Sequence, residues 1–196
     1  RRQRQMCIRD STWDNVEGYQ PPPELSTSEI TTSEITTTEF PPLPNIQINT
    51  YSAEIVDEPK IKGYLEIYQG DDKIEEHNIG IEIRGSSSQF FDKKSYGFET
   101  WDEEGEDLNV SLAGYPEEED WILYGPYSDK SLIRNVLIYN LSNQIDRYAT
   151  KTKFYNLDIN NQFLGVYVLM EKIKRDKNRV DISKNKAEDI SGGYII

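Results

Sequence analysis

Several residue types that build common functional sites are scarce in this chain of 196 residues. It has one cysteine, Cys7, so no internal disulfide can form. It has one histidine, His77, and no second cluster of metal-binding residues, which argues against a zinc site. No run of about 18 apolar residues occurs, so we predict no membrane span.

Basic residues are few relative to acidic ones. The chain has 22 Lys and Arg against 35 Asp and Glu, which gives a net charge of −13. A surplus of negative charge repels the phosphate backbone of nucleic acids and the headgroups of anionic lipids. The composition therefore argues against nucleic acids and anionic membrane surfaces as partners.

Apolar residues make up 36% of the chain, so part of it is not expected to pack into a core. Residues 1–44 fit this description, because three pentapeptides rich in Ser and Thr (STSEI, TTSEI and TTTEF) lie between two groups of prolines. We expect a disordered tail and extended linker, open to O-glycosylation if the protein is secreted. A short edge strand through Ile30 and Ile35 is the alternative. Such linkers favour an extracellular or cell-surface location, and the start at Arg1 without a signal peptide indicates a fragment or a processed product.

From residue 45 onwards, apolar and polar residues alternate as in half-buried strands. This pattern predicts strands at residues 45–51, 60–68, 121–124, 153–159 and 163–171, and a strand–loop–strand hairpin over residues 79–99. One helix is predicted over residues 130–145, after a cap at Ser128 or Asp129. Its apolar face consists of Leu132, Ile133, Val136, Leu137, Leu141 and Ile145. The fold class that we predict is α+β, with a mostly antiparallel sheet and one main helix.

Ten acidic residues lie between Glu99 and Asp120 without a single Lys or Arg. Their mutual repulsion predicts an exposed, solvated loop around a short strand at residues 108–112. A divalent-cation site is the alternative, but the acids lack the regular spacing of calcium loops. We therefore assign no metal ligand.

The loop of the 79–99 hairpin combines small polar residues with positive charge. Ser86, Ser87 and Ser88 follow Gly85, and Arg84, Lys93 and Lys94 flank them. Backbone N–H groups, hydroxyls and a fixed cation are what a phosphate group requires. A polar hairpin with solvated lysines is the alternative, because small polar loops are common.

Six stretches, taken together and in order, resemble the CotH family, the kinase-like relatives of spore coat protein H. They lie at residues 83–88 (IRGSSS), 93–98 (KKSYGF), 127–135 (YSDKSLIRN), 165–173 (GVYVLMEKI), 178–182 (NRVDI) and 191–195 (SGGYI). The resemblance covers residues 79–196, and the tail takes no part in it.

The resemblance implies an atypical protein-kinase-like fold that binds ATP with Mg or Mn and phosphorylates secreted or surface proteins on serine. By analogy with kinases, the hairpin loop would cover the phosphates. The nucleotide-binding residues that it implies are Arg84, Ser86, Ser87, Lys94 and Glu171. Lys94 is the candidate for the phosphate-pairing lysine, and Lys93 is the second choice. Glu171 would be the partner of that lysine or an adenine-pocket residue, and a salt bridge to Lys172, Lys174 or Arg134 is its alternative. Arg134 and Asn135 are expected to fasten the helix to the sheet.

Kinase chemistry also needs an aspartate that orients the acceptor hydroxyl and carboxylates that hold the metal. The resemblance places these beyond Ile196, so no catalytic residue is assigned, and Asp181 and Asp189 are not promoted to that role. We therefore expect residues 45–196 to be an N-lobe-like part of a CotH domain, truncated at its C-terminus and inactive alone. The alternative is a non-catalytic adhesion or assembly module of spore-coat or cellulosome type with a CotH-like fold. The expected partner of a kinase is a serine-rich protein.

Overall fold

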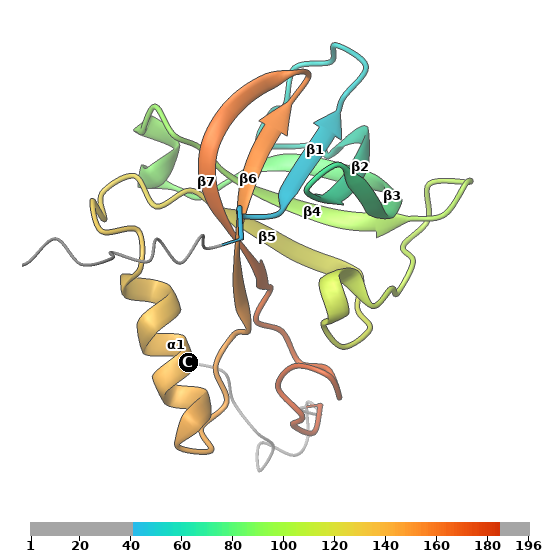
Figure 1. Cartoon of the computed structure of the whole chain (residues 1–196). Coiled ribbons are helices and arrows are strands. Elements are labelled where there is room, and N and C mark those ends of the chain that lie inside the picture. The colour runs from blue at the N-terminus through green and yellow to red at the C-terminus, as the bar shows by residue number, and fades with distance from the viewer. Residues whose placement is uncertain (1–40, 185–196) are drawn as a thin grey trace, which may run out of the picture. The chain divides into compact units, whose positions relative to one another are not determined.

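The computed structural model describes residues 41–184, which form seven strands, two short 3-10 helices and one α-helix (Figure 1). The expected tail at residues 1–40 and the apolar stretch at residues 192–196 lie outside the described residues. The elements in chain order are β1 (Asn45–Asn49), β2 (Ile61–Gln69), β3 (Asp72–Arg84), η1 (Ser87–Phe90), β4 (Ser95–Trp101), η2 (Leu112–Gly114), β5 (Asp120–Tyr124), α1 (Arg134–Gln144), β6 (Thr152–Ile159) and β7 (Gln162–Glu171).

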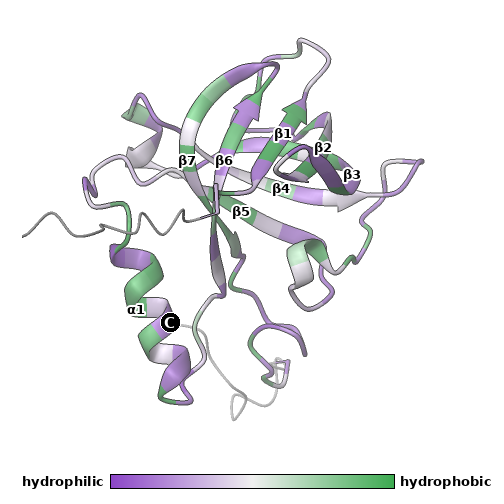
Figure 2. Ribbon diagram, in the orientation of Figure 1, coloured by the Kyte–Doolittle hydropathy of each residue, from purple (hydrophilic) through white to green (hydrophobic). Residues whose placement is uncertain are grey.

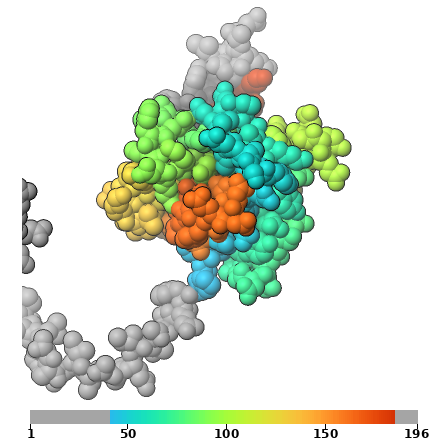
Figure 3. All heavy atoms as spheres, turned by 90° about the horizontal axis from the view of Figure 1, so that it is seen from above, coloured from blue at the N-terminus to red at the C-terminus, as the bar shows by residue number. Residues whose placement is uncertain are grey.

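The seven strands close into a barrel in the order β1-β2-β3-β4-β5-β7-β6. All neighbours are antiparallel except β1 and β6, which run parallel and complete the ring. Viewed from above, the β6–β7 turn (orange) lies at the centre of one end (Figure 3).

The predicted α+β fold with an atypical kinase-like N-lobe is therefore wrong. The molecule is a closed β-barrel with one helix outside it. The period-two pattern reports which residues of a strand face inwards, and this is the same for an open sheet and for a barrel. Closure depends on the pairing of Asn45–Ile48 with Asn156–Ile159, more than 100 residues away, which no local pattern encodes.

The barrel interior is filled by alternate residues of every strand, as the hydropathy colouring indicates (Figure 2). The fully buried side chains include Ile46, Leu65, Ile67, Ile79, Ile81, Phe98, Trp121, Leu123, Tyr155, Leu157, Tyr167 and Leu169. Burial of one such large side chain contributes about 1.5–3 kcal/mol. Packing of these side chains fixes the positions of the strand ends. Residues at two of these ends, Arg84 of β3 and Glu171 of β7, line the candidate site.

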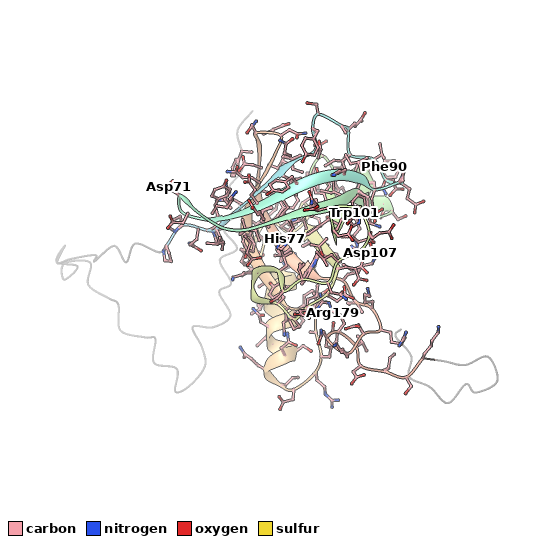
Figure 4. All side chains as sticks on the ribbon, turned by 90° about the vertical axis from the view of Figure 1, so that its right-hand side faces the viewer. Asp71, His77, Phe90, Trp101, Asp107 and Arg179 are labelled. Carbon is pink, nitrogen blue, oxygen red and sulfur yellow. The ribbon has the colours of Figure 1, made fainter. Side chains whose placement is uncertain are left out.

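The longest strand, β3, extends from the turn at Asp71 to Arg84 (Figure 4). It includes residues 73–77, which the sequence pattern leaves ambiguous. Halfway along it, Gly80 lies directly against the ring of Trp101, and a methyl group at Gly80 would overlap that ring. Glycine here permits the close approach of β3 and the β4 aromatic side chain.

Helix α1 begins at Arg134, four residues later than predicted. The carboxylate of Asp129 accepts hydrogen bonds from the backbone N–H groups of Ser131 (3.0 Å) and Arg134 (2.9 Å). Between them, Leu132 has a left-handed backbone (φ 64°), which interrupts the helix. Asp129 is one of the two predicted cap residues. Its carboxylate stabilises the turn that precedes the helix.

The apolar face of α1 does not pack against the barrel as a buried stripe. None of the helical residues from Arg134 to Gln144 is buried, and Leu137, Ile138 and Leu141 remain 47–60% exposed.

No helix within residues 41–184 is long and apolar enough to cross a membrane, in line with the sequence prediction.

Candidate ligand-binding cleft

Two adjoining cavities lie beside α1. The first, here called the polar cavity, has a volume of about 310 Å³ and is lined by Arg84, Ile122, Tyr124, Asn135, Tyr139, Thr150, Met170, Glu171, Lys172 and Ile173. The second, the apolar cavity, has a volume of about 430 Å³ and is lined by Ile138, Tyr139, Ser142, Tyr148, Ala149, Thr150, Ile173 and Val180. Tyr139, Thr150 and Ile173 line both, so the two cavities are neighbours.

The barrel topology brings two predicted site residues to the polar cavity. Arg84 ends β3, Glu171 ends β7, and β4 and β5 lie between these strands in the sheet. The Arg84 side chain is exposed, and its guanidinium makes no hydrogen bond or ion pair with any residue of the described part. Its donors are therefore available to a ligand, because a guanidinium carries five N–H groups and cannot be neutralised near pH 7.

Glu171 lines the same cavity, but both of its carboxylate oxygens are already engaged. Oε1 accepts a hydrogen bond from Nη1 of Arg179 at 3.0 Å, and Oε2 accepts one from the backbone N–H of Lys151 at 2.9 Å. Both side chains of the Glu171–Arg179 ion pair are at most 1% exposed. The guanidinium of Arg179 also lies 4.8 Å from the ring of Trp121.

The salt-bridge partner of Glu171 is thus Arg179, and among the described contacts it is not Lys172, Lys174 or Arg134. Arg179 lies below the strands, towards the end of the barrel where α1 is found (Figure 4). The sequence shows a basic segment at residues 172–179, but it contains five cations, and nothing in it singles out Arg179. The structure assigns Glu171 first of all to the packing of this end of the barrel.

Lys94 does not line either cavity. Its ammonium group donates to the backbone oxygens of Gln89 (2.6 Å) and Phe91 (2.7 Å), and so ties together the loop between β3 and β4. Lys93 donates to the backbone oxygen of Leu164 (2.8 Å) and lies 4.1 Å from the ring centre of Tyr167. Burial lowers the pKa of Lys93.

The two predicted loop serines also lie outside the polar cavity. Ser86 precedes η1, and its carbonyl accepts a hydrogen bond from the N–H of Gln89 at 3.2 Å. Ser87 is the first residue of η1. The five predicted residues are therefore split: Arg84 and Glu171 meet at the cavity, whereas Ser86, Ser87 and Lys94 belong to the adjacent loop.

A cluster of carboxylates and lysines beside the polar cavity was missed by the sequence analysis. Lys174 lies 2.6–2.8 Å from carboxylate oxygens of Glu118, Glu119 and Asp120, and Lys172 lies 2.6 Å from Asp120. Glu118 and Asp120 are buried, so the expectation of a fully solvated acidic face was wrong for them. The apolar segment that follows them, Trp121–Tyr124, draws them into the barrel as part of β5 or directly before it.

Ionisation of this cluster is set by opposing effects. Burial by itself would raise the pKa of Asp120, but hydrogen bonds from Lys172 and Lys174 outweigh it and hold the pKa below its usual range. Carboxylate oxygens of Glu118, Glu119 and Asp120 lie within 4.8 Å of one another, the type of arrangement that can hold a cation. Here the cation that they hold is the ammonium group of Lys174.

One buried polar atom in a residue beside the cleft has no partner in the described part of the chain. The hydroxyl of Thr150, which lines both cavities, is buried and has no hydrogen-bond partner among the described residues. A buried polar group without a partner is rare, because it loses its bonds to water. Arg84 and Lys172 thus supply positive charge at one end of the cleft, and aromatic and aliphatic side chains line the other end.

Among the curated proteins, none matches this chain. A family model described as CotH kinase protein matches residues 81–195, a range that includes every residue lining the two cavities. Because the match covers more than half of the chain, and agrees with the resemblance found in the sequence, the chain belongs to the CotH family.

Proposed function

We propose that this protein is part of a phosphotransferase that binds ATP in the cleft beside α1 and phosphorylates serine residues of secreted or surface proteins. The observation that carries the proposal is Arg84, an unpaired guanidinium at a cavity of about 310 Å³ that adjoins an apolar cavity. Membership of a family described as kinases supports the reaction class.

The chemistry of the lining suits the parts of a nucleotide. Arg84 can donate two parallel N–H bonds to phosphate oxygens, which are shorter and stronger than bonds between neutral groups. Lys172 adds a second cation to the same cavity, although its ammonium group is also paired with the carboxylate of Asp120. Tyr139 and Ile173 offer flat and apolar surface to a base.

The lining does not by itself provide a metal site. Glu171 is the carboxylate residue that lines the polar cavity, and both of its oxygens are taken by Arg179 and Lys151. A Mg²⁺ or Mn²⁺ ion would therefore arrive with the phosphates, which is common for Mg²⁺.

The closed barrel changes where the nucleotide is expected. Lys94 and Glu171 do not pair, since each is committed to other bonds. The proposal therefore assigns the phosphates to Arg84 rather than to Lys94. Expected partners are a serine-rich acceptor protein outside the cell or at its surface, in keeping with the Ser/Thr/Pro-rich segment at residues 21–44.

Calorimetric titration of the 196-residue chain with ATP and Mg²⁺ tests the proposal. Arg84→Ala should weaken binding by 1.5–3 kcal/mol, about 10- to 100-fold, the range for a lost hydrogen bond to a charged group. The matched control is Arg147→Ala, which removes an exposed arginine that lines neither cavity. Absence of binding by the folded chain, or equal losses in the two variants, would refute the assignment.

A further inference from the structure

The outer face of α1 carries a row of exposed apolar side chains. Ile133, Leu137, Leu141 and Ile145 are 47–71% exposed and follow one another at intervals of four residues, so they form one stripe along the helix. Ile138 lies beside this stripe and also lines the apolar cavity. Figure 2 shows these green segments on a helix that stands apart from the strands. A stripe of this kind usually lies against a partner.

The chain itself leads back to this stripe. After β7, Ile173 and Val180 line the apolar cavity together with Ile138 and Tyr139 of α1. The described part then ends at Lys184, four residues after Val180. Lys184 is therefore only four residues along the chain from the lining of the apolar cavity.

The residues that follow Lys184 include apolar side chains of the kind that can cover the stripe. Ile190, Tyr194, Ile195 and Ile196 lie within 12 residues of Lys184. Twelve residues can span up to about 40 Å, whereas a helix of 11 residues is about 16 Å long, so the reach is sufficient. The barrel offers no edge strand to receive this segment, because each of its seven strands already has two neighbours.

Charge favours the same pairing. Helix α1 contains no acidic residue, although the chain as a whole has a net charge of −13. Arg134 and Arg147 lie at its two ends, and Glu188 and Asp189 directly precede Ile190. Acidic groups at the start of the segment can thus meet cations that flank the stripe.

We propose that residues 190–196 dock on the α1 stripe (Ile133, Leu137, Ile138, Leu141 and Ile145) and at the mouth of the apolar cavity. The helix then acts as a bridge, with the barrel on one side and this segment on the other. The inference does not depend on nucleotide binding.

Cysteine labelling in the full chain tests the proposal. With Cys7→Ser as background, Leu137→Cys introduces a thiol at a position that is 53% exposed. Docking should slow its reaction with a maleimide by at least about tenfold, since labelling then requires local opening. Tyr194→Asp together with Ile195→Asp should restore the fast rate.

The control thiol is Phe163→Cys, which is 63% exposed and lies at the opposite end of β7 from Glu171. Its labelling rate should be fast and the same with either segment. Equal, fast labelling of both thiols in the unaltered segment would overturn the proposal, and would leave the stripe to another protein.

Disulfide trapping provides a second measurement that does not rely on a disruptive variant. In the same background, Leu137→Cys and Ile195→Cys should form a bond within one chain on mild oxidation, whereas Phe163→Cys and Ile195→Cys should not. Protection of the thiol that appears only at high protein concentration, with sedimentation as a dimer, would identify a second copy as the occupant and overturn the proposal.

Discussion

Removal of one partner from the buried pair of Glu171 and Arg179 should be one of the most destabilising single changes in this barrel. The perturbation is Glu171→Gln, which keeps the shape of the side chain and can still accept the hydrogen bond from the N–H of Lys151. It removes the negative charge that balances Arg179, whose side chain is fully buried. The Nε and Nη2 atoms of Arg179 already have no hydrogen-bond partner in the described part of the chain.

The magnitude follows from this burial. Removal of one partner of a buried ion pair leaves an uncompensated charge and lowers the free energy of unfolding by about 3–5 kcal/mol. For a domain of about 150–250 residues, 1 kcal/mol corresponds to roughly 2–4 °C in Tm, so Tm should fall by roughly 6–20 °C. Since whole domains are stable by only about 5–15 kcal/mol, the variant should be close to the limit of folding.

Urea unfolding followed by tryptophan fluorescence is the assay, because Trp121 lies against Arg179 and reports on this end of the barrel. Arg179→Met should be destabilised to a similar degree as Glu171→Gln. The double variant should be less destabilised than the sum of the two, with a coupling of roughly 2–3 kcal/mol. The control is Glu76→Gln, which removes the exposed partner of Lys73 and should leave the midpoint unchanged.

A loss below about 1 kcal/mol for Glu171→Gln would refute this reasoning, because such a value is typical of a surface ion pair. Glu171 would then not be needed to neutralise Arg179, and its carboxylate would again be a candidate for direct ligand binding. The experiment thus decides between a structural role and a binding role for a residue that lines the polar cavity.

Three further predictions concern the barrel and its rim. Gly80→Ala should lower the free energy of unfolding by about 1–3 kcal/mol through overlap with the ring of Trp101, and Trp101→Ala in the same chain should recover part of the loss in urea melts. Lys94→Ala should lower Tm by freeing two loop carbonyls, yet leave ATP affinity by calorimetry unchanged within about twofold, the scale below 0.5 kcal/mol. A selective loss of ATP affinity would instead restore the sequence-based role of Lys94. The lowered pKa of Asp120 contributes stability above its unfolded pKa of about 4, and this is lost as pH falls through the folded pKa. Lys174→Met should therefore flatten the decline of Tm below about pH 5, and an unchanged decline would contradict this assignment.

The strands were largely predictable because their signals are local. β6 and β7 lie within one residue of the predicted ranges, and the turn between them contains Asn160 and Asn161. Both have a left-handed backbone (φ 51° and 64°), a conformation that asparagine tolerates better than most residues. Closure of the barrel and exposure of the α1 stripe depend on contacts between distant segments, which periodicity does not specify.

The candidate site was predicted only in part, because the sequence does not specify the hydrogen-bond and ion-pair partners of its charged side chains. Sequence indicates which charged residues are present, but not which of them already have partners. Lys94 is the predicted phosphate-pairing lysine, but it lies in the loop before β4, which begins at Ser95. The ammonium donors of Lys94 are used by loop carbonyls, and the two carboxylate oxygens of Glu171 accept hydrogen bonds from Arg179 and from the backbone N–H of Lys151. A ligand that recruits such a group must first break its existing bonds, whereas a ligand at Arg84 breaks none recorded in the described structure. For this reason Arg84, which makes no hydrogen bond or ion pair with residues 41–184, is a better guide to the binding site than the number of charges in any stretch of the sequence.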